Sequence, residues 1–219
     1  GQRLAPLREE GVMIIGSGNV VHNLGRIDSA KREGGFDWAV RFDEAAREIM
    51  TTRPADVLSL QTEQLPTDVD LIWASPPCTH YSCARTKAKT PRDLVGSDAL
   101  VRKVLELVYH YMHVDFFMEN PHSGLLKSRE VVAGIPMQIV DYCKYGKPYR
   151  KRTSIWTDSG WVPQRPLCTH DCPASLGTRH TARAQRVPIG GAPRFSRDEL
   201  YSIPAELCDE IAEYASGRL

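Results

Sequence analysis

The residue in this sequence that is best suited to take part in a reaction is a cysteine that follows two prolines. Cys78 ends the stretch "DLIWASPPC", directly after Pro76 and Pro77. Proline fixes its φ angle at about −65° and removes a backbone donor, so the turn leaves the next side chain little freedom. A thiol held in this way can act as a nucleophile once it is deprotonated. The alternative is an ordinary buried cysteine, a common environment for this residue type.

A carboxyl group follows a later apolar stretch of the chain. Glu119 and Asn120 end the run "VDFFMEN", and Pro121 comes next. In open α/β sheets, ligands bind beyond the carboxyl ends of the parallel strands. If both apolar runs are strands of such a sheet, Cys78 and Glu119 converge on one cleft.

The elements that must position these residues alternate between short apolar runs and helical stretches. A helix is expected between Ser97 and Met112, with Ser97 as its N-cap and Asp98 in its first turn. Strands are expected at 12–15, 38–42, 55–60, 69–74, 114–120, 138–146 and 153–158. This alternation predicts an α/β fold with a doubly wound, mostly parallel sheet, formed by residues 1–219 as a single domain.

Size and charge limit the classes of protein to which the chain can belong. Its 219 residues carry 28 basic and 27 acidic side chains, so a polyanion must be met by local patches. Two stretches, 142–157 and 172–197, contain arginines or lysines and no acid. The apolar run at 12–15 is far shorter than the roughly 20 residues of a membrane span. We therefore expect a soluble, intracellular monomer without a membrane partner, whose six cysteines are reduced.

Three motifs occur in an order that resembles the cytosine-C5 DNA methyltransferases. They are "SPPC" (75–78), "ENP" (119–121) and "YGKPYRKRT" (145–153). From about residue 56 to about residue 214 the chain is most similar to small, phage-type members of that family. The resemblance implies the Rossmann-like fold of methyltransferases that use S-adenosylmethionine, and double-stranded DNA as substrate. It also implies methyl transfer to C5 of a flipped cytosine, and a cytoplasmic location in a bacterium or a phage-infected cell.

The same resemblance assigns roles to individual residues. Cys78 would add to C6 of the cytosine, Glu119 would engage its N3 edge, and Arg150 and Arg152 would steady the site. Two residues apart on a strand, these arginines share a face and can bind phosphate or brace the cysteine loop. The alternative for them is a solvated basic edge. The residues expected to contact substrate are Pro77, Asn120 and Pro121.

The N-terminal segment departs from the family, because the Phe-x-Gly-x-Gly type cofactor loop is missing. Residues 1–50 instead resemble a segment of the LigB-type extradiol dioxygenases related to DOPA dioxygenase, in which His22 would belong to the active site. Residues 1–55 still offer a strand, a "GSG" turn and later acids, so we expect an atypical cofactor side there. The expected contacts with S-adenosylmethionine are Gly16, Ser17 and Gly18 at its methionine part, Asp43 at the ribose, Asp56 near the adenine, and Pro76.

A stretch of about 30 residues, 157–186, stands where larger relatives hold a target-recognition domain, so discrimination between DNA sequences should be limited. Within it, the zinc-ligand types Cys168, His170, Cys172 and His180 have a spacing that matches no common finger. The favoured interpretation is a loop with two half-buried thiols and no metal, and a zinc site formed by these four residues is the weaker alternative. For the remaining cysteines, Cys83, Cys143 and Cys208, we expect packing roles only.

Two alternatives to the enzyme remain open at this point. The first is a catalytically silent module that binds nucleic acid and has lost cofactor binding. The second, less favoured, is a metal protein of the extradiol dioxygenase type. A dioxygenase needs a facial set of iron ligands, and only His22 matches that family's site.

Overall fold

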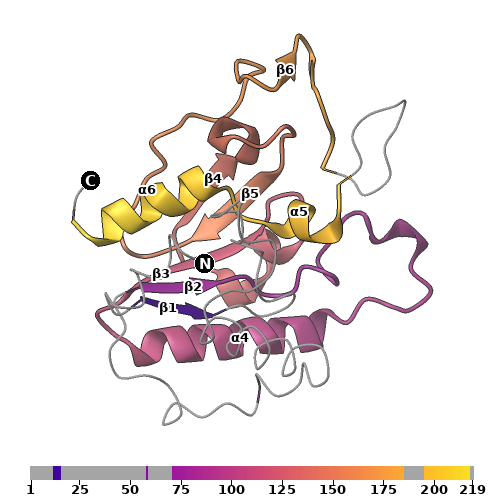
Figure 1. The fold of residues 1–219 in the computed structure, drawn as a ribbon. Coiled ribbons are helices and arrows are strands. Elements are labelled where there is room, and N and C mark those ends of the chain that lie inside the picture. Colours follow the sequence, from indigo (N-terminus) through magenta and orange to yellow (C-terminus); the bar gives the residue numbers. More distant parts are fainter. Residues whose placement is uncertain (1–11, 16–57, 59–70, 185–194, 218–219) are drawn as a thin grey trace, which may run out of the picture.

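A five-stranded sheet forms the centre of the computed structural model, which describes residues 12–15, 58, 71–184 and 195–217 (Figure 1). The strand order is β1-β2-β3-β5-β4. The strands span Val12–Ile15 (β1), Leu71–Ala74 (β2), Asp115–Pro121 (β3), Met137–Asp141 (β4) and Arg152–Trp156 (β5). The strand predicted at 38–42 lies outside the described residues, and so does all of the strand predicted at 55–60 except Leu58.

The sheet is parallel on one side and antiparallel on the other. β1, β2 and β3 are parallel, with Ile72 beside Phe116, whereas β5 runs antiparallel to both β3 and β4. The chain passes from β4 to β5 through residues 142–151, which hold the 3-10 helix η5 (Tyr142–Tyr145). A parallel connection needs a crossover of about a dozen or more residues, usually with an α-helix. The predicted mostly parallel sheet is therefore found only in part, and the predicted strand at 138–146 ends at Asp141.

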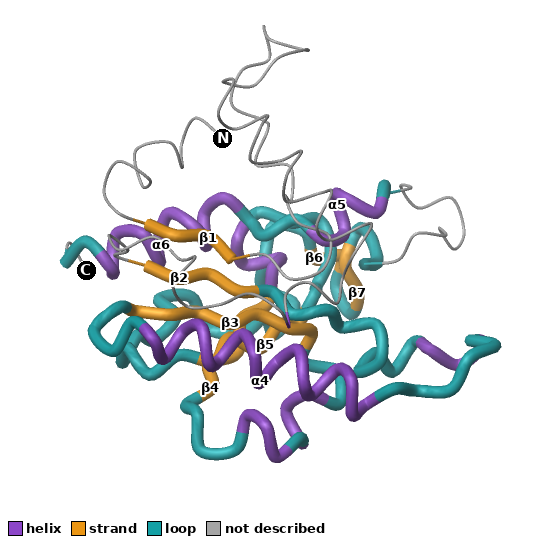
Figure 2. Tube along the Cα trace, turned by 90° about the horizontal axis from the view of Figure 1, so that it is seen from below, coloured by secondary structure: helices purple, strands orange, loops and turns teal. Residues whose placement is uncertain are grey.

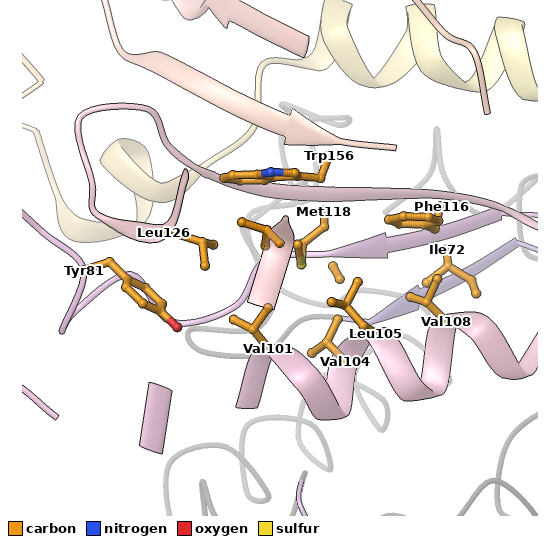
Figure 3. Packing of buried hydrophobic residues seen from close by; sticks show 12 residues of the cluster. Ile72, Tyr81, Val101, Val104, Leu105, Val108, Phe116, Met118, Leu126 and Trp156 are labelled. Atoms are coloured by element: carbon orange, nitrogen blue, oxygen red, sulfur yellow. The ribbon is translucent and has the colours of Figure 1, made fainter. Parts of the chain in front are cut away.

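Helices cover both faces of the sheet. Helix α4 (Leu94–His110) lies on one face (Figures 1 and 2), and helix α6 (Ala205–Ala215) lies on the other (Figure 1). Side chains alternate along the strands, so Ile72 and Met118 pack toward α4 (Figure 3), while Phe117 packs with Leu207 of α6. The described residues also form the short helix α5 (Arg197–Tyr201), a ribbon of β6 (Ser175–Leu176) and β7 (Arg179–His180), and three further 3-10 helices, η2 (Arg85–Lys87), η3 (Leu126–Ser128) and η4 (Glu130–Val132). In the described part of the chain, no helix combines the length and the apolar character that crossing a membrane requires.

Helix α4 begins earlier than the sequence predicted. Its N-cap is Asp93, whose carboxylate accepts a hydrogen bond from the backbone N–H of Gly96 at 2.8 Å. Ser97 and Asp98, predicted as the cap and first turn, lie inside the helix and are buried. The expected cap at Ser97 is therefore wrong, because an acid four residues earlier satisfies the free backbone donors.

Asp98 instead anchors the loop that follows Cys78. Its side chain accepts a hydrogen bond from the hydroxyl of the buried Tyr81 at 2.8 Å, and Arg129 donates to its Oδ2 from Nη2 at 2.6 Å. The hydrogen bonds from Arg129 hold the pKa of Asp98 below its usual value, although burial acts in the opposite direction. This trio ties the start of the loop at residues 79–93 to α4 and to the segment before the 3-10 helix η4 (Glu130–Val132).

Replacing Asp98 with Asn is expected to lower the free energy of unfolding by about 1–3 kcal/mol near neutral pH, because hydrogen bonds to a charged, buried carboxylate are lost. The folded pKa of Asp98 is lowered, so its contribution is complete above the usual pKa of 3.8 and disappears as the pH falls through the lower folded value. Urea unfolding at several pH values should show the gap between wild type and Asp98→Asn shrinking below about pH 4.

The exposed Asp158 provides the control for this experiment, and Asp158→Asn should change stability little at any pH. A gap between wild type and Asp98→Asn that stayed constant down to acid pH would contradict the ionic anchor.

Candidate active site

Cys78 lies just beyond the carboxyl end of β2, on the prolyl turn that the sequence predicted. Its backbone carbonyl accepts hydrogen bonds from the N–H groups of Tyr81 at 3.0 Å and Ser82 at 2.8 Å. The chain therefore bends sharply directly after the cysteine, and Tyr81 is then held by Asp98. The backbone hydrogen bonds to the Cys78 carbonyl and the hydrogen bond between Tyr81 and Asp98 therefore fix the chain on the C-terminal side of Cys78.

Asn120 fixes the upstream side of the same turn. Its side-chain Nδ2 donates to the carbonyl oxygen of Pro76 at 2.8 Å, and the side chain is 1% exposed. β2 and β3 pair in parallel with Ala74 beside Met118, so Asn120 stands where β2 has ended and the prolyl turn has begun. Asn120 and Pro76, expected to contact substrate and cofactor respectively, thus contact each other. This hydrogen bond positions the backbone that carries Cys78.

Glu119 is buried in the same region and has two polar neighbours. Its Oε1 accepts a hydrogen bond from the hydroxyl of Tyr142 at 3.2 Å and lies 3.7 Å from Nζ of Lys151. The Lys151 ammonium also lies 4.9 Å from the centre of the Tyr142 ring. Tyr142 comes from η5 and Lys151 from the segment before β5, so three separate segments meet at one carboxyl group.

Both charges act on the thiol of Cys78. Burial raises the pKa of Cys78 most, the negative charge of Glu119 raises it further, and the positive charge of Lys151 opposes them. Cys78 and Glu119 therefore share one electrostatic environment, as the strand-end rule predicted. The net result is a thiol that stays protonated at neutral pH until something removes its proton.

Lys151 is a residue of this site that the sequence analysis missed. Side chains alternate along an extended strand, and β5 places Ile155 opposite Glu119, so residues 151, 153 and 155 share the face of Glu119. Arg152 points to the other face. The alternation of side chains within "YRKRT" would have identified Lys151 as the residue that faces Glu119, once the register between β5 and β3 was known.

Arg152 contacts β4 instead of the cysteine loop. Its Nε and Nη2 donate to the two carboxylate oxygens of the buried Asp141 at 2.9 and 2.7 Å. The expectation that Arg152 braces the cysteine loop is therefore corrected, because the partner across the antiparallel β4–β5 pair is Asp141. Arg150 precedes β5 and its side chain is exposed. The catalytic roles expected for both arginines stay predictions.

Much of the basic charge between residues 142 and 157 is already engaged within the described protein. Lys144 pairs with Asp171 at 2.8 Å, and Lys147 donates to the hydroxyl of Ser202. The carboxylate partners of Lys144, Lys151 and Arg152 offset part of the charge that this stretch offers to a polyanion. The exposed Arg150 is the member of the stretch best placed to reach an external phosphate.

The residues expected to hold a cofactor fall almost wholly outside the described part of the chain. They are Gly16, Ser17, Gly18, Asp43 and Asp56. Pro76 is described and buried. Of the residues expected at the substrate, Pro77 and Pro121 are half-buried, and the carbonyl of Pro121 accepts a hydrogen bond from Gly124.

A second cluster of reactive side chains gathers away from Glu119. The ligand atoms of Cys143, Cys168, Cys172 and His180 all lie within 4.8 Å of one another. The sequence singled out His170 in place of Cys143, for which it predicted packing only. Cys143 is distant along the chain and reaches the cluster through η5, so no local spacing could have included it.

Comparisons with known proteins point to one family. A family model described as "C-5 cytosine-specific DNA methylase" matches residues 37–138, a range that contains Cys78 and Glu119. A "Probable DNA (cytosine-5)-methyltransferase" of Frog virus 3 (isolate Goorha) is 36% identical over 165 residues, covering 68% of this chain and 76% of the viral protein.

A shorter similarity agrees with the resemblance to dioxygenases. A "4,5-DOPA dioxygenase extradiol" of Escherichia coli (strain K12) is 41% identical over 51 residues, which cover 23% of this chain and 19% of the bacterial protein. This match takes in a small part of either protein, whereas the viral methyltransferase matches over most of both lengths. The chain therefore belongs to the C-5 cytosine-specific DNA methylase family.

Proposed function

We propose that this protein is a DNA cytosine-C5 methyltransferase in which Cys78 forms a covalent adduct with a flipped cytosine. The observation that carries the proposal is the anchoring of the Cys78 turn from both sides, by Asn120 and by Tyr81, next to the buried Glu119. A nucleophile needs such a fixed position, because small displacements from the reacting atom cost large factors in rate.

The reaction starts from a weak nucleophile, since C5 of cytosine does not attack a methyl group by itself. The Cys78 thiol passes its proton to the carboxylate of Glu119 as Sγ bonds to C6, and the ring electrons move to C5 while the protonated Glu119 donates to N3. S-adenosylmethionine, when bound, supplies the methyl group at C5. Loss of the C5 proton then lets the Sγ–C6 bond break, which releases Cys78 and the methylated base.

Glu119 makes the addition to C6 feasible by binding the N3 edge of the ring. A carboxyl group that donates a hydrogen bond or a proton to N3 draws electrons from C6. Tyr142 and Lys151 both contact Oε1, so they hold the carboxyl group in one orientation and we assign Oε2 to the base. Lys151 is a positioning residue here, and it also opposes the rise in the pKa of Cys78.

The chemistry of the N-terminal residues fits S-adenosylmethionine. Glycines at 16 and 18 let a ligand approach the backbone closely, and carboxylates such as those of Asp43 and Asp56 accept hydrogen bonds from ribose hydroxyls and from the adenine amino group. We propose that residues 1–55 belong to the same Rossmann-like, single-domain fold as the rest of the chain and hold the methyl donor.

The proposed substrate is double-stranded DNA. The target base must leave the helix to reach Cys78, at a cost of a few kcal/mol. Contacts to the phosphates from exposed arginines such as Arg150 would offset part of this cost. The insert at 157–186 is short, so the recognised sequence should be short as well.

Cys78→Ser should lower methyl transfer at least about a thousandfold, because a hydroxyl replaces the attacking thiolate. DNA that contains 5-fluorocytosine traps the adduct, since fluorine cannot leave as the C5 proton does, and Cys78→Ser should form none. The control is Cys83→Ser, which removes an exposed thiol from the same loop and should leave transfer and trapping unchanged. Equal trapping by Cys78→Ser and wild type would refute the assignment of the nucleophile.

Glu119→Gln and Lys151→Gln should move the pKa of Cys78 in opposite directions. Glu119 raises that pKa and Lys151 lowers it, so Glu119→Gln should lower the pH at which the thiol becomes reactive and Lys151→Gln should raise it. The measurement is the rate of Cys78 alkylation by iodoacetamide against pH, read by mass spectrometry of the Cys78 peptide. Lys144→Gln, whose partner is Asp171, serves as a charge-matched control. Shifts of the same sign would contradict the arrangement.

Calorimetric titration of the full chain with S-adenosylmethionine should show saturable binding. Asp43→Ala should weaken it about tenfold or more, because hydrogen bonds to a charged carboxylate are lost, whereas Asp158→Ala should not. Failure of the wild-type chain to bind would favour the silent nucleic-acid-binding module.

A further inference from the structure

Three cysteines and one histidine meet where the insert returns to the edge of the sheet. Cys143 lies on η5 directly after β4, Cys168 and Cys172 lie in the loop after β5, and His180 lies in β7. We propose that these four residues bind one zinc ion, which fastens the insert to the central sheet. This site is separate from Cys78 and Glu119 and does not depend on the proposed function.

The positions of the ligand atoms suit tetrahedral coordination. Zn–S and Zn–N bonds of about 2.3 and 2.0 Å place neighbouring ligand atoms about 3.5–3.8 Å apart in a tetrahedron. The four ligand atoms all lie within 4.8 Å of one another, and Sγ of Cys168 is 3.3 Å from Nε2 of His180. Side-chain adjustments of about 1 Å would therefore close the site around an ion without a change of fold.

The backbone around the cysteines is held by contacts outside the cluster. The N–H of Cys168 donates to Oδ2 of Asp141 at 3.0 Å, and Asp171, between Cys168 and Cys172, pairs with Lys144 at 2.8 Å. His170 has a φ angle of 70°, a left-handed conformation that turns the chain between the two cysteines. These contacts shape the loop so that both thiols lie beside Cys143.

Beyond Trp161, which is buried against Phe117 at the start of the insert, the insert has little apolar packing to keep it folded. The three cysteines form their own buried cluster, joined in the described residues by Ala174, while Val162, Leu167 and Leu176 are exposed. A ribbon made of two-residue strands is too short to be stable by itself. Segments without an adequate core commonly depend on a metal ion or a disulfide. An odd number of thiols next to an imidazole fits a metal better than a disulfide.

The set of donors selects the kind of metal. Thiolates and an imidazole favour zinc over magnesium or calcium, which take oxygen ligands. Four protein ligands complete the tetrahedron and leave no position for water, so the ion would be structural rather than catalytic. Binding releases one proton from each of the three thiols, so affinity should fall at acid pH.

Metal analysis of the purified full chain tests the site directly. We expect about one zinc per chain in the wild type and in Cys83→Ser, and below about 0.2 in Cys143→Ser, Cys168→Ser and Cys172→Ser. Wild-type protein with less than about 0.2 zinc per chain after zinc addition would overturn the proposal. Should the serine variants fail to fold, cobalt replacement in wild type still decides: tetrahedral thiolate-bound cobalt gives intense visible bands, and their absence would overturn it.

The two histidines of the insert, His170 and His180, allow a controlled test of which one is the fourth ligand. Their rings are 5.1 Å apart, but only His180 belongs to the cluster. His180→Ala should weaken zinc binding more than about a hundredfold, since loss of an outer partner alone costs up to that much, and His170→Ala should leave it unchanged. The reverse result would overturn the assignment of His180.

Removal of zinc should also loosen the insert. Trypsin cleavage after the exposed Arg179 and Arg183 should become faster when a chelator is added, and zinc should restore protection. Unchanged cleavage would show that an ion, if bound, does not hold the insert, and would overturn its structural role.

Discussion

The hydrogen bond from Asn120 to the carbonyl of Pro76 is the contact on which the geometry of the candidate active site depends. A buried carbonyl without a partner costs about 1–3 kcal/mol, so this bond favours one position of the prolyl turn over others. It forms because β2 and β3 are parallel and end at the same edge, with β3 continuing three residues beyond Met118, the partner of Ala74. Tyr81 and Asp98 hold the other side of the turn, and Cys78 has little freedom between them.

The same edge of the sheet sets the charge state of the thiol. Glu119 and Lys151 act on Cys78 with opposite sign, and burial adds to the effect of Glu119, so the resting thiol is protonated. A protonated thiol is protected from adventitious reactions, because the thiolate is the reactive form.

Several elements could be predicted because their signals are local. The strands β2 and β3 follow from short apolar runs, and the prolyl turn and Glu119 follow directly after them. The antiparallel half of the sheet was missed, because strand direction depends on the connection between β4 and β5 and not on the composition of the strands. The start of α4 was misplaced, because Asp93 and Ser97 are both good capping residues and only the fold selects between them.

The sequence by itself determined the chemistry: a thiol on a prolyl turn, a carboxyl group at a strand end, and basic residues nearby in the order of the family. Each of these is a local pattern, so the residue types and their order were enough. Only the tertiary structure decided which side chains meet. Lys151, which the sequence did not single out, lies beside Glu119, and Cys143 takes the place of His170 in the thiol cluster. Both outcomes depend on strand register and on contacts between distant segments, which no local pattern encodes.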